Sequence, residues 1–363
     1  MVEAKKYIKG LFRTLPESAK RAGKIVRLDR NEHTTPFPER HLRNILDNIT
    51  PDEIAAYPEL EPFYGKLSKW LKVNRDQLLI TSGSDTGIKA IYEVYVEEDD
   101  EVVVFPPTYE MYAVYCAMFG GIKKEVLYNE DFSLPVEKVL NAINHKTKLV
   151  AIANPNHTGT PFKESELIEI IKAARDNDAM VLIDEAYYHF YEYTMLPYIN
   201  KFDNLIIART FSKAFGIAAL RVGYLVSNKD TIAQLYKDKL THEITIVSAK
   251  FGEYLLDHLE IMEDYIREVK KGIEYLSKEF RQLGISTPKT YANFLYAKLP
   301  EGIDAERMVK LLKEKNFYIR GPFSMPPLKG FIRITVGPVE QMRDFISVFK
   351  QIHERIQNKE SVI

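Results

Sequence analysis

The chain has 363 residues, of which 45% are apolar, enough for one large core or two smaller ones. Its 50 lysines and arginines nearly cancel its 51 aspartates and glutamates, so no basic surplus points to a nucleic-acid partner. A single cysteine, Cys116, excludes an intrachain disulfide framework and favours a reducing, cytoplasmic setting. No apolar stretch is long enough to span a membrane, and Met1–Arg13 lacks the apolar run of a secretory signal, so we expect neither a membrane partner nor export.

Short apolar runs recur along the first two-thirds of the chain, and several are rich in β-branched residues. They are too short for most helices and therefore predict strands buried on both faces. An amphipathic helix is predicted between two of them, over Glu164–Asn177. Strands that alternate with helices predict an α/β domain with a mostly parallel sheet. The predicted strands are Leu78–Ile80, Val102–Phe105, Leu149–Ile152, Met180–Ile183, Leu205–Ala208 and Gly223–Val226.

The pattern changes after residue 240. A long amphipathic helix is predicted over Met262–Leu283, because its apolar residues step by three and four. Strands are predicted at Phe294–Ala297 and Phe331–Val336, with a helix at Ala305–Lys315 between them. We therefore expect a large α/β domain over 44–240 and a smaller α+β domain built from 1–43 and 241–363.

Three side chains that could bind different parts of one ligand lie next to predicted strands. Lys213 has apolar neighbours, and burial beside positive charge would lower the pKa of its amine and make it a nucleophile. Asp184 ends a buried strand, where a carboxylate is costly without a cationic partner. Arg221 follows Lys213 by eight residues. Together they match an aldehyde cofactor with a basic ring nitrogen and a phosphate, which is pyridoxal 5'-phosphate.

Each of these residues also has an ordinary interpretation. Most lysines are solvated, Asp184 could cap a helix, and Arg221 could form a surface ion pair. Tyr187 favours the cofactor site, because it lies three residues after Asp184 and could reach the cofactor's phenolic oxygen. Glu185 is the weaker carboxylate candidate, since its side chain should point to the opposite side from that of Asp184.

Turns after the strands supply further candidates. Thr81–Gly87 joins a strand to a helix expected to begin near Asp85, and a helix start with small residues favours anion binding. Asn156, in the turn after Leu149–Ala153, could donate to the phenolic oxygen, although the same residues also suit an ordinary turn. Tyr109 could stack on the cofactor ring, but it is one of 22 tyrosines. All these residues are expected at the carboxyl ends of strands, where open α/β sheets bind ligands.

These motifs resemble those of fold-type I, class I/II aminotransferases, which depend on pyridoxal 5'-phosphate, and most closely the histidinol-phosphate aminotransferase group. The resemblance runs from about Leu28 past Phe331–Val336, and the spacing of the asparagine, aspartate, tyrosine, lysine and arginine motifs is specific. It implies the fold-type I architecture with the cofactor in the large domain. It also implies a transaminase that moves an amino group between a small amino compound, which could carry a phosphate, and a 2-oxo acid.

The resemblance implies a role for each matching residue. Lys213 would form an imine with the cofactor and move the substrate proton, Asp184 would pair with the pyridinium, and Tyr187 would bind the phenolic oxygen. The other implied cofactor contacts are Asn156 at the phenolic oxygen, Tyr109 on the ring, and Ser84, Asp85, Thr210, Ser212 and Arg221 at the phosphate. Tyr57 resembles a tyrosine sent to the phosphate of a second subunit, which implies a homodimer. The implied substrate contacts are Arg333, Arg320, Asn31 and Glu32. No metal site is expected.

The sequence departs from the family pattern at two places that matter. His157 replaces the usual proline after Asn156, and the turn is expected to survive. Glu243 lies in a segment that usually approaches the substrate, where it would repel an anion or bind a cationic group. His33 and His242 could each be ordinary surface residues. Histidinol phosphate itself is therefore a weaker expectation than the cofactor.

Two other functions compete with transamination. A phospho-amino-acid decarboxylase would need the same cofactor residues and would differ only in which substrate bond stands perpendicular to the ring. A non-catalytic regulator on this fold would need an additional DNA-binding module, and the sequence has no extra basic segment that could form one. Such a relative would also be expected to lose Lys213, which is present.

Overall fold

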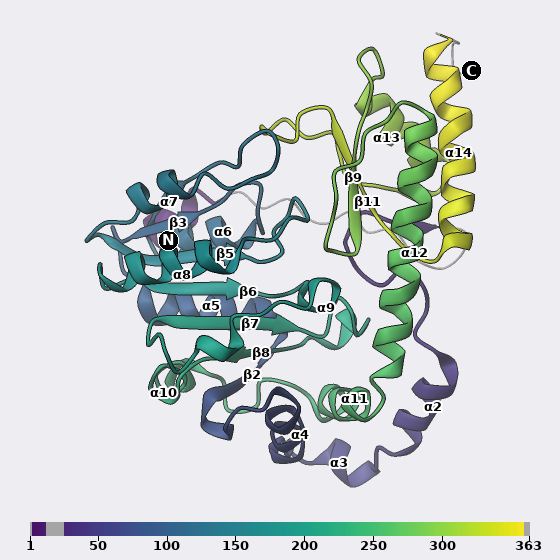
Figure 1. The fold of residues 1–363 in the computed structure, drawn as a ribbon. Coiled ribbons are helices and arrows are strands. Elements are labelled where there is room, and N and C mark those ends of the chain that lie inside the picture. Colours follow the sequence, from purple (N-terminus) through teal and green to yellow (C-terminus); the bar gives the residue numbers. More distant parts are fainter. Residues whose placement is uncertain (1, 12–24, 359–363) are drawn as a thin grey trace.

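The computed structural model describes residues 2–11 and 25–358. Within them, seven strands form one sheet in the order β2-β8-β7-β6-β5-β3-β4, and every neighbouring pair is parallel except the two pairs that contain β8 (Figure 1). This confirms the mostly parallel α/β sheet and all six strands predicted for it. The strands are β2 Leu78–Ser82, β3 Glu101–Val104, β4 Ile122–Glu125, β5 Thr147–Ala153, β6 Met180–Asp184, β7 Leu205–Thr210 and β8 Val222–Val226.

Strand β4 was not predicted. Its sequence Ile-Lys-Lys-Glu carries no apolar run, and all four residues are exposed at the edge of the sheet. Pairing with β3 alone makes it a strand. Lysine-rich edge strands of this kind discourage association with a second sheet.

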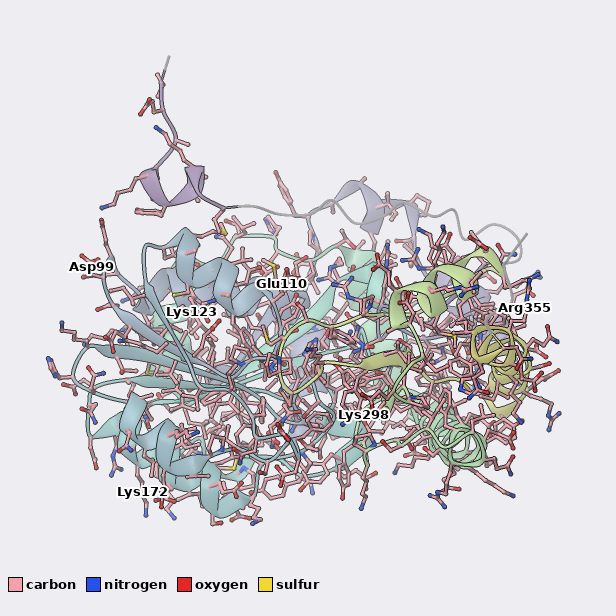
Figure 2. The ribbon with its side chains drawn as sticks, turned by 90° about the horizontal axis from the view of Figure 1, so that it is seen from above. Asp99, Glu110, Lys123, Lys172, Lys298 and Arg355 are labelled. Atoms are coloured by element: carbon pink, nitrogen blue, oxygen red, sulfur yellow. The ribbon has the colours of Figure 1, made fainter. Side chains whose placement is uncertain are left out.

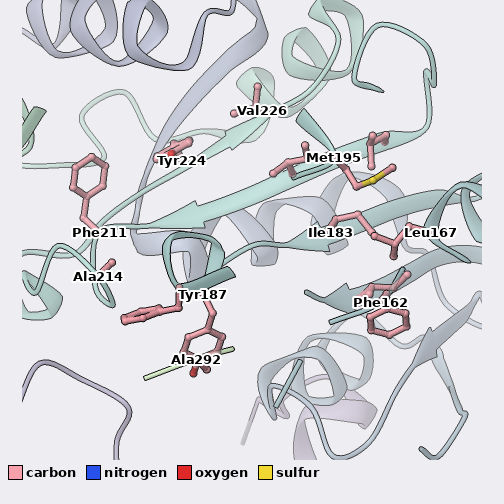
Figure 3. Packing of buried hydrophobic residues seen from close by; sticks show 14 of the residues in the cluster. Phe162, Leu167, Ile183, Tyr187, Met195, Phe211, Ala214, Tyr224, Val226 and Ala292 are labelled. Atoms are coloured by element: carbon pink, nitrogen blue, oxygen red, sulfur yellow. The ribbon is translucent and has the colours of Figure 1, made fainter. Parts of the chain in front are cut away.

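Helices cover both faces of the sheet, and the strands alternate between two hydrophobic cores. Ile183 packs with one core and its neighbour Leu182 with the other, as the pleat of a strand requires. Figure 3 shows Ile183 near Leu167 of α8 and Phe162 in the first of these cores. The helices of that face are α4 Glu61–Leu71, α7 Val136–Ala142, α8 Glu164–Arg175 and α11 Ile246–Asp257. Those of the other face are α5 Gly83–Tyr95, α6 Met111–Met118 and α10 Lys229–Asp238.

A smaller unit packs beside the sheet and has a core of its own. Its antiparallel pair joins β9 Phe294–Lys298 to β11 Phe331–Thr335, as predicted, and three helices lie against it: α12 Glu260–Gln282, α13 Ala305–Glu314 and α14 Val339–Gln357. In Figure 1, α12 and α14 run side by side. A short parallel pair, β1 Val26–Arg27 with β10 Phe317–Tyr318, brings the N-terminal segment to this unit.

Helix α12 joins the two cores. Its residues Tyr265 and Val269 pack with the core of the large sheet, while Leu276 and Phe280 pack with that of the smaller unit. Phe251 of α11 also belongs to the large core. The domain division at residue 240 stays a prediction, and residues 1, 12–24 and 359–363 of the predicted smaller domain lie outside the described residues.

Short elements and turns complete the described fold. They are α1 Lys6–Lys9, α2 Glu39–Asp47, α3 Pro51–Ala55, α9 Tyr188–Tyr191, and the 3-10 helices Arg75–Gln77, Leu196–Tyr198 and Ala218–Leu220. Charged side chains such as Asp99, Lys172 and Arg355 lie at the periphery in Figure 2. In the ranges that the structure covers, no helix combines the length and apolar character needed to cross a bilayer.

Candidate active site

A cavity of 780 Å³ opens at the edge where β5, β6 and β7 end. Residues of the N-terminal segment 30–37 and Arg333 of β11 also line it, so residues from both units meet there. Most of the predicted site residues line this single cavity: Asn31, Glu32, Ser84, Asp85, Tyr109, Asp184, Tyr187, Thr210, Ser212, Lys213, Arg221 and Arg333.

Lys213 lies on the loop after β7, and its side chain is partly buried in the cavity. Burial and, after it, the positive charge of Arg333 lower the pKa of its amine to about 8, although Asp184 and Glu32 oppose the shift. A larger fraction of the amine is therefore uncharged near neutral pH than in an ordinary lysine, and the uncharged form is the one that a nucleophilic lysine requires.

Asp184 ends β6 and is only 5% exposed. Its carboxylate accepts hydrogen bonds from the Tyr112 hydroxyl at 2.7 Å and from the Ala186 backbone N–H at 3.1 Å. Burial raises its pKa to about 6, although both hydrogen bonds act in the other direction. No ion pair to Asp184 is found among the described residues. A cationic ligand group would therefore be stabilised beside it.

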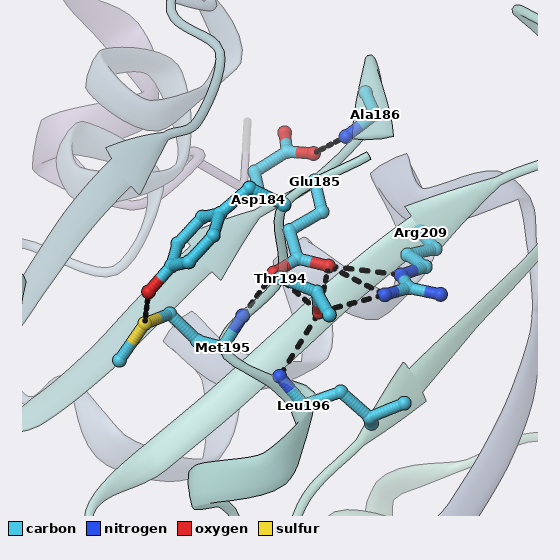
Figure 4. Close-up of polar contacts among 8 residues, drawn as sticks. Asp184, Glu185, Ala186, Thr194, Met195, Leu196 and Arg209 are labelled. Carbon is cyan, nitrogen blue, oxygen red and sulfur yellow. Dashed lines mark hydrogen bonds and ion pairs between the residues drawn. The ribbon is translucent and has the colours of Figure 1, made fainter. Parts of the chain in front are cut away.

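Glu185 points to the opposite face of the sheet, as expected (Figure 4). Its carboxylate is paired with Arg209, whose Nη2 lies 2.8 Å away, and it accepts from the Thr194 hydroxyl and the Met195 N–H, both at 2.8 Å. The side chains of Glu185 and Arg209 are 0% and 4% exposed. All its acceptor capacity is used inside the protein, so it is not a ligand group.

One end of the cavity gathers hydrogen-bond donors suited to an anion. Helix α5 begins there at Gly83, two residues before the predicted start, and the side chain of its N-cap residue, Ser82, makes no capping hydrogen bond. A Cβ on Gly83 would lie 2.5 Å from the Arg221 guanidinium, and one on Gly223 would lie 2.2 Å from the Ser84 nitrogen. Only glycine permits this close approach of the helix start and the guanidinium.

Arg221 adopts a left-handed backbone conformation, with φ of 53°. Such a conformation costs a non-glycine residue roughly 1–2 kcal/mol, and residues of this kind cluster at functional sites. Because β8 is antiparallel to its neighbours, its first residue lies at the same edge as the carboxyl ends of the other strands. Arg221 precedes its strand, yet it lies at the edge of the sheet where the other site residues gather, as expected.

The small unit and the N-terminal segment close the other end. Arg333 is 7% exposed; its Nη2 donates to the Asp29 carbonyl at 3.0 Å, while its buried Nε has no hydrogen-bond partner among the described residues. Asn31 donates from its side-chain amide to the Tyr187 hydroxyl at 2.9 Å, and its backbone N–H donates to the Thr335 hydroxyl at 2.9 Å. The segment 30–37 is thereby tied to both units.

Several residues singled out from the sequence do not line this cavity. Asn156 is buried in its own turn. Tyr57 is 77% exposed and stacks on His242 with ring centroids 4.3 Å apart. Arg320 lines a neighbouring cavity of 490 Å³, although its backbone bridges that of Arg333. Glu243 instead accepts a hydrogen bond from the Ser82 backbone N–H at 3.2 Å.

Sequence reasoning missed several lining or supporting residues. Tyr112 of α6 was not distinguished from the other tyrosines, although it lies only three residues after Tyr109, whose ring it contacts. His33 lines the cavity and stacks on Tyr265 with centroids 3.4 Å apart, so it is not an ordinary surface residue. His157 also lines the cavity, where only preservation of the turn had been expected.

The residues present fit pyridoxal 5'-phosphate. A helix start without a side-chain cap, two hydroxyls and Arg221 can hold a phosphate, and Asp184 can hold a protonated ring nitrogen. Lys213 can react with an aldehyde, and the Tyr109 ring offers an aromatic wall. Because Gly83 and Gly223 lack side chains, the Arg221 guanidinium and the N–H groups at the start of α5 lie close enough to contact one phosphate.

The family model for aminotransferases of class I and II matches residues 24–349. The chain belongs to this family. It is a pyridoxal 5'-phosphate-dependent aminotransferase with the fold-type I architecture, which confirms the family, fold, enzyme class and cofactor expected from the sequence.

Relatives of this aminotransferase match over most of its length. It is 32% identical over 331 residues to the histidinol-phosphate aminotransferase of Caldanaerobacter subterraneus. The aligned region covers 90% of this chain and 92% of that one. It is 32% identical to the corresponding enzyme of Clostridium novyi, over 92% of this chain and 94% of that one. The histidinol-phosphate aminotransferase of Sinorhizobium meliloti, solved with pyridoxal-5'-phosphate, has the same fold, with a TM-score of 0.85, 22% identity and coverage of 99% and 98%. These matches give the decarboxylase alternative no support.

Proposed function

We propose that this aminotransferase transfers an amino group from a small amino compound with an anionic group, histidinol phosphate being the first to test, to a 2-oxo acid. The observation that carries the proposal is one cavity holding three complementary groups. They are the Lys213 amine with its lowered pKa, the buried Asp184 carboxylate without an ion-pair partner, and the buried Arg333 guanidinium with one N–H unpartnered among the described residues.

The proposed roles follow from the position of each group. When bound, pyridoxal 5'-phosphate supplies a ring that accepts electrons from the amino-bearing carbon of the substrate. Lys213 holds the cofactor covalently and then moves the proton at that carbon as base and acid. Asp184 keeps the ring nitrogen protonated, and Tyr187 donates to the phenolic oxygen. The proposed phosphate donors are Ser84, Asp85, Thr210, Ser212 and Arg221, with Tyr109 against the ring.

Arg333 is proposed to bind the anionic group of the substrate. Its unpartnered Nε and its partial use by the Asp29 carbonyl leave donor capacity for a carboxylate or phosphate. Asn31 and Glu32 would close over the substrate, because their segment lies across the cavity. Arg320 is proposed as a second arginine for longer substrates, supported by its backbone bridge to Arg333.

We also propose a homodimer in which Tyr57 reaches the phosphate site of the partner subunit. Support comes from its 77% exposure and from two further exposed apolar side chains, Ile54 at 60% and Leu240 at 69%. A mixed dimer of Lys213→Ala and Tyr57→Ala subunits tests this. It should keep one site of wild-type cofactor affinity, whereas weak binding at every site would contradict a contribution across the interface.

We also propose that the protein works in the cytoplasm, a reducing compartment. The buried Cys116, which forms no disulfide, supports this setting.

The function is tested with a panel of amino acids and amino phosphates, following the visible absorbance of the cofactor-loaded enzyme. An amino donor should deplete the band and a 2-oxo acid should restore it, without release of carbon dioxide. Lys213→Ala should lose both the band and turnover, while a matched change of an exposed lysine, Lys237→Ala, should lose neither. Full activity in Lys213→Ala would overturn the assignment.

A further inference from the structure

The side chain of Asn31 is held between two hydroxyl groups that come from different units of the fold. The Asn31 backbone N–H donates to the Thr335 hydroxyl at 2.9 Å, and that hydroxyl donates back to the Asn31 amide oxygen at 3.3 Å. The amide nitrogen of Asn31 donates to the Tyr187 hydroxyl at 2.9 Å. All three residues are buried. The N-terminal segment, the end of β11 and the turn after β6 are therefore joined by one chain of hydrogen bonds.

The directions of these hydrogen bonds follow from the hydrogens available. The Thr335 hydroxyl carries a single hydrogen, and among the described residues its recorded acceptor is the Asn31 amide oxygen. Turning the amide around would leave that hydrogen without an acceptor there. The amide nitrogen of Asn31 therefore faces Tyr187, and the Tyr187 oxygen accepts in this contact.

Because its oxygen accepts from Asn31, the Tyr187 hydroxyl keeps its own hydrogen for another acceptor. No second hydrogen bond of this hydroxyl is found in the part of the chain that the structure describes. Tyr187 lines the cavity beside Lys213 and Asp184. Its ring packs edge-on against that of Phe294, with centroids 5.4 Å apart, so packing restrains the ring while the hydroxyl hydrogen can still turn. That hydrogen is available to an oxygen of a ligand in the cavity.

We propose that Asn31 is a positioning residue, which points the Tyr187 hydroxyl hydrogen at the cofactor's phenolic oxygen. The inference rests on the proposed cofactor contact of Tyr187, and it gives Asn31 a role besides closing over the substrate. Thr335 orients the Asn31 amide, the amide orients the hydroxyl, and the hydroxyl stabilises negative charge on the phenolic oxygen. Thr335, a residue of the smaller unit, thereby acts on the cofactor without contacting it.

The charges around Tyr187 agree with a donor role. Burial raises the pKa of its hydroxyl, and the negative charge of Asp184 adds to the rise, so the hydroxyl stays protonated at neutral pH. The positive charge of Arg333 and the hydrogen bond from Asn31 act on this pKa in the opposite direction. A hydroxyl whose oxygen accepts a hydrogen bond becomes a stronger donor through its own hydrogen.

The test uses Asn31→Gly, because Asn31 has a left-handed backbone with φ of 52°, which glycine adopts without strain. The control is Asn316→Gly, the same change at a residue with φ of 66° that does not line the cavity. Each change is made alone and together with Tyr187→Phe. Two quantities are measured: the pH midpoint at which the visible band of the cofactor-loaded protein changes, and the cofactor Kd of cofactor-free protein by calorimetry. Thermal unfolding checks the fold, and Asn31→Asp, which keeps the shape of the side chain but not its donor, is used if glycine impairs it.

For Asn31→Gly we expect a midpoint raised by about 0.5 pH unit and a Kd raised roughly threefold, because an oxygen whose donor is poorly oriented binds its proton more tightly. Asn31→Asp should raise the midpoint at least as far. Most of either rise should disappear in the Tyr187→Phe background, since the effect of Asn31 passes through that hydroxyl. Asn316→Gly should leave both quantities in place.

An Asn31 variant that folds and keeps the wild-type midpoint would overturn the inference, as would an equal rise with and without the Tyr187 hydroxyl. An unchanged midpoint in Tyr187→Phe would also overturn it, because the hydroxyl would then not contact the phenolic oxygen. A wild-type protein that forms no visible band with the cofactor would instead refute the proposed function.

Discussion

Asp184 and Glu185 are adjacent carboxylates at the end of one strand, and they do opposite things. Asp184 faces the cavity, has two neutral hydrogen-bond donors and a raised pKa, and lacks an ion-pair partner among the described residues. Glu185 faces the core on the other side of the sheet, where Arg209, Thr194 and Met195 use its oxygens. The Asp184 carboxylate can still pair with a cationic ligand, whereas the Glu185 carboxylate is already fully hydrogen-bonded within the protein.

The difference shows how burial produces either reactivity or rigidity. A buried carboxylate without a cation is poised to stabilise a cationic ligand, because pairing relieves its cost of burial. A buried carboxylate with a cation binds nothing further, but removal of either partner leaves an uncompensated charge. The arginine also stacks on the Tyr188 ring at 3.8 Å, which fixes its position.

The largest expected effect comes from the cavity side. Asp184→Ala removes the group that would keep the cofactor nitrogen protonated, so we expect kcat/KM to fall by roughly 10³-fold, or about 4 kcal/mol, and cofactor binding to weaken. Steady-state kinetics and cofactor titration measure both. A rate close to that of the wild type would remove the proposed role of Asp184.

On the opposite side, Arg209→Ala should damage stability rather than chemistry. It leaves Glu185 buried and unpaired, so we expect the free energy of unfolding to fall by about 3–5 kcal/mol, measured by denaturant titration. Arg43→Ala, which breaks an exposed ion pair with Glu39, is the control and should change stability far less. If Arg209→Ala stays fully stable but loses turnover, the conclusion that Glu185 and Arg209 serve stability rather than catalysis is wrong.

The lowered pKa of Lys213 predicts a pH dependence of cofactor capture. Because its folded pKa is about 8, below its usual value, the uncharged amine becomes more abundant as pH rises through 8. The rate at which cofactor-free protein captures pyridoxal 5'-phosphate should therefore rise about tenfold between about pH 7 and pH 9 and then level off. A rate that is flat over this range, measured by stopped-flow absorbance, would contradict the lowered pKa.

The smallest expected effect sharpens the description of Asp184. Tyr112→Phe removes the 2.7 Å hydrogen bond to its carboxylate, which lowers the pKa of Asp184 in the wild type. The variant should bind cofactor with an affinity changed by about 1 kcal/mol, or roughly fivefold, and should keep its fold. Calorimetry measures the change, and Tyr198→Phe, which loses an exposed hydrogen bond to Glu164 and does not line the cavity, is a matched control.

Much of this protein was predictable from local sequence. The runs before Asp184 and Lys213 predicted strands, and the alternation of strand and helix predicted a parallel sheet whose carboxyl ends gather polar residues. The chemistry of Asp184, Lys213 and Arg221 predicted the cofactor, because one ligand limits which groups can stand together. The resemblance of the surrounding motifs to those of class I/II aminotransferases predicted the family. Strand β4 escaped prediction because its pairing with β3, rather than its own residues, makes it a strand.

What the sequence alone determined was the chemistry on offer: an amine, a carboxylate, an arginine and small residues at a helix start, each carried by a pattern within one element. Only the tertiary structure decided which of the neighbours Asp184 and Glu185 faces the cavity, and which residues meet there. Both outcomes depend on the pleat of a strand and on contacts between residues such as Asn31 and Tyr187, which lie 156 positions apart. Such long-range contacts exist only once the two cores have packed.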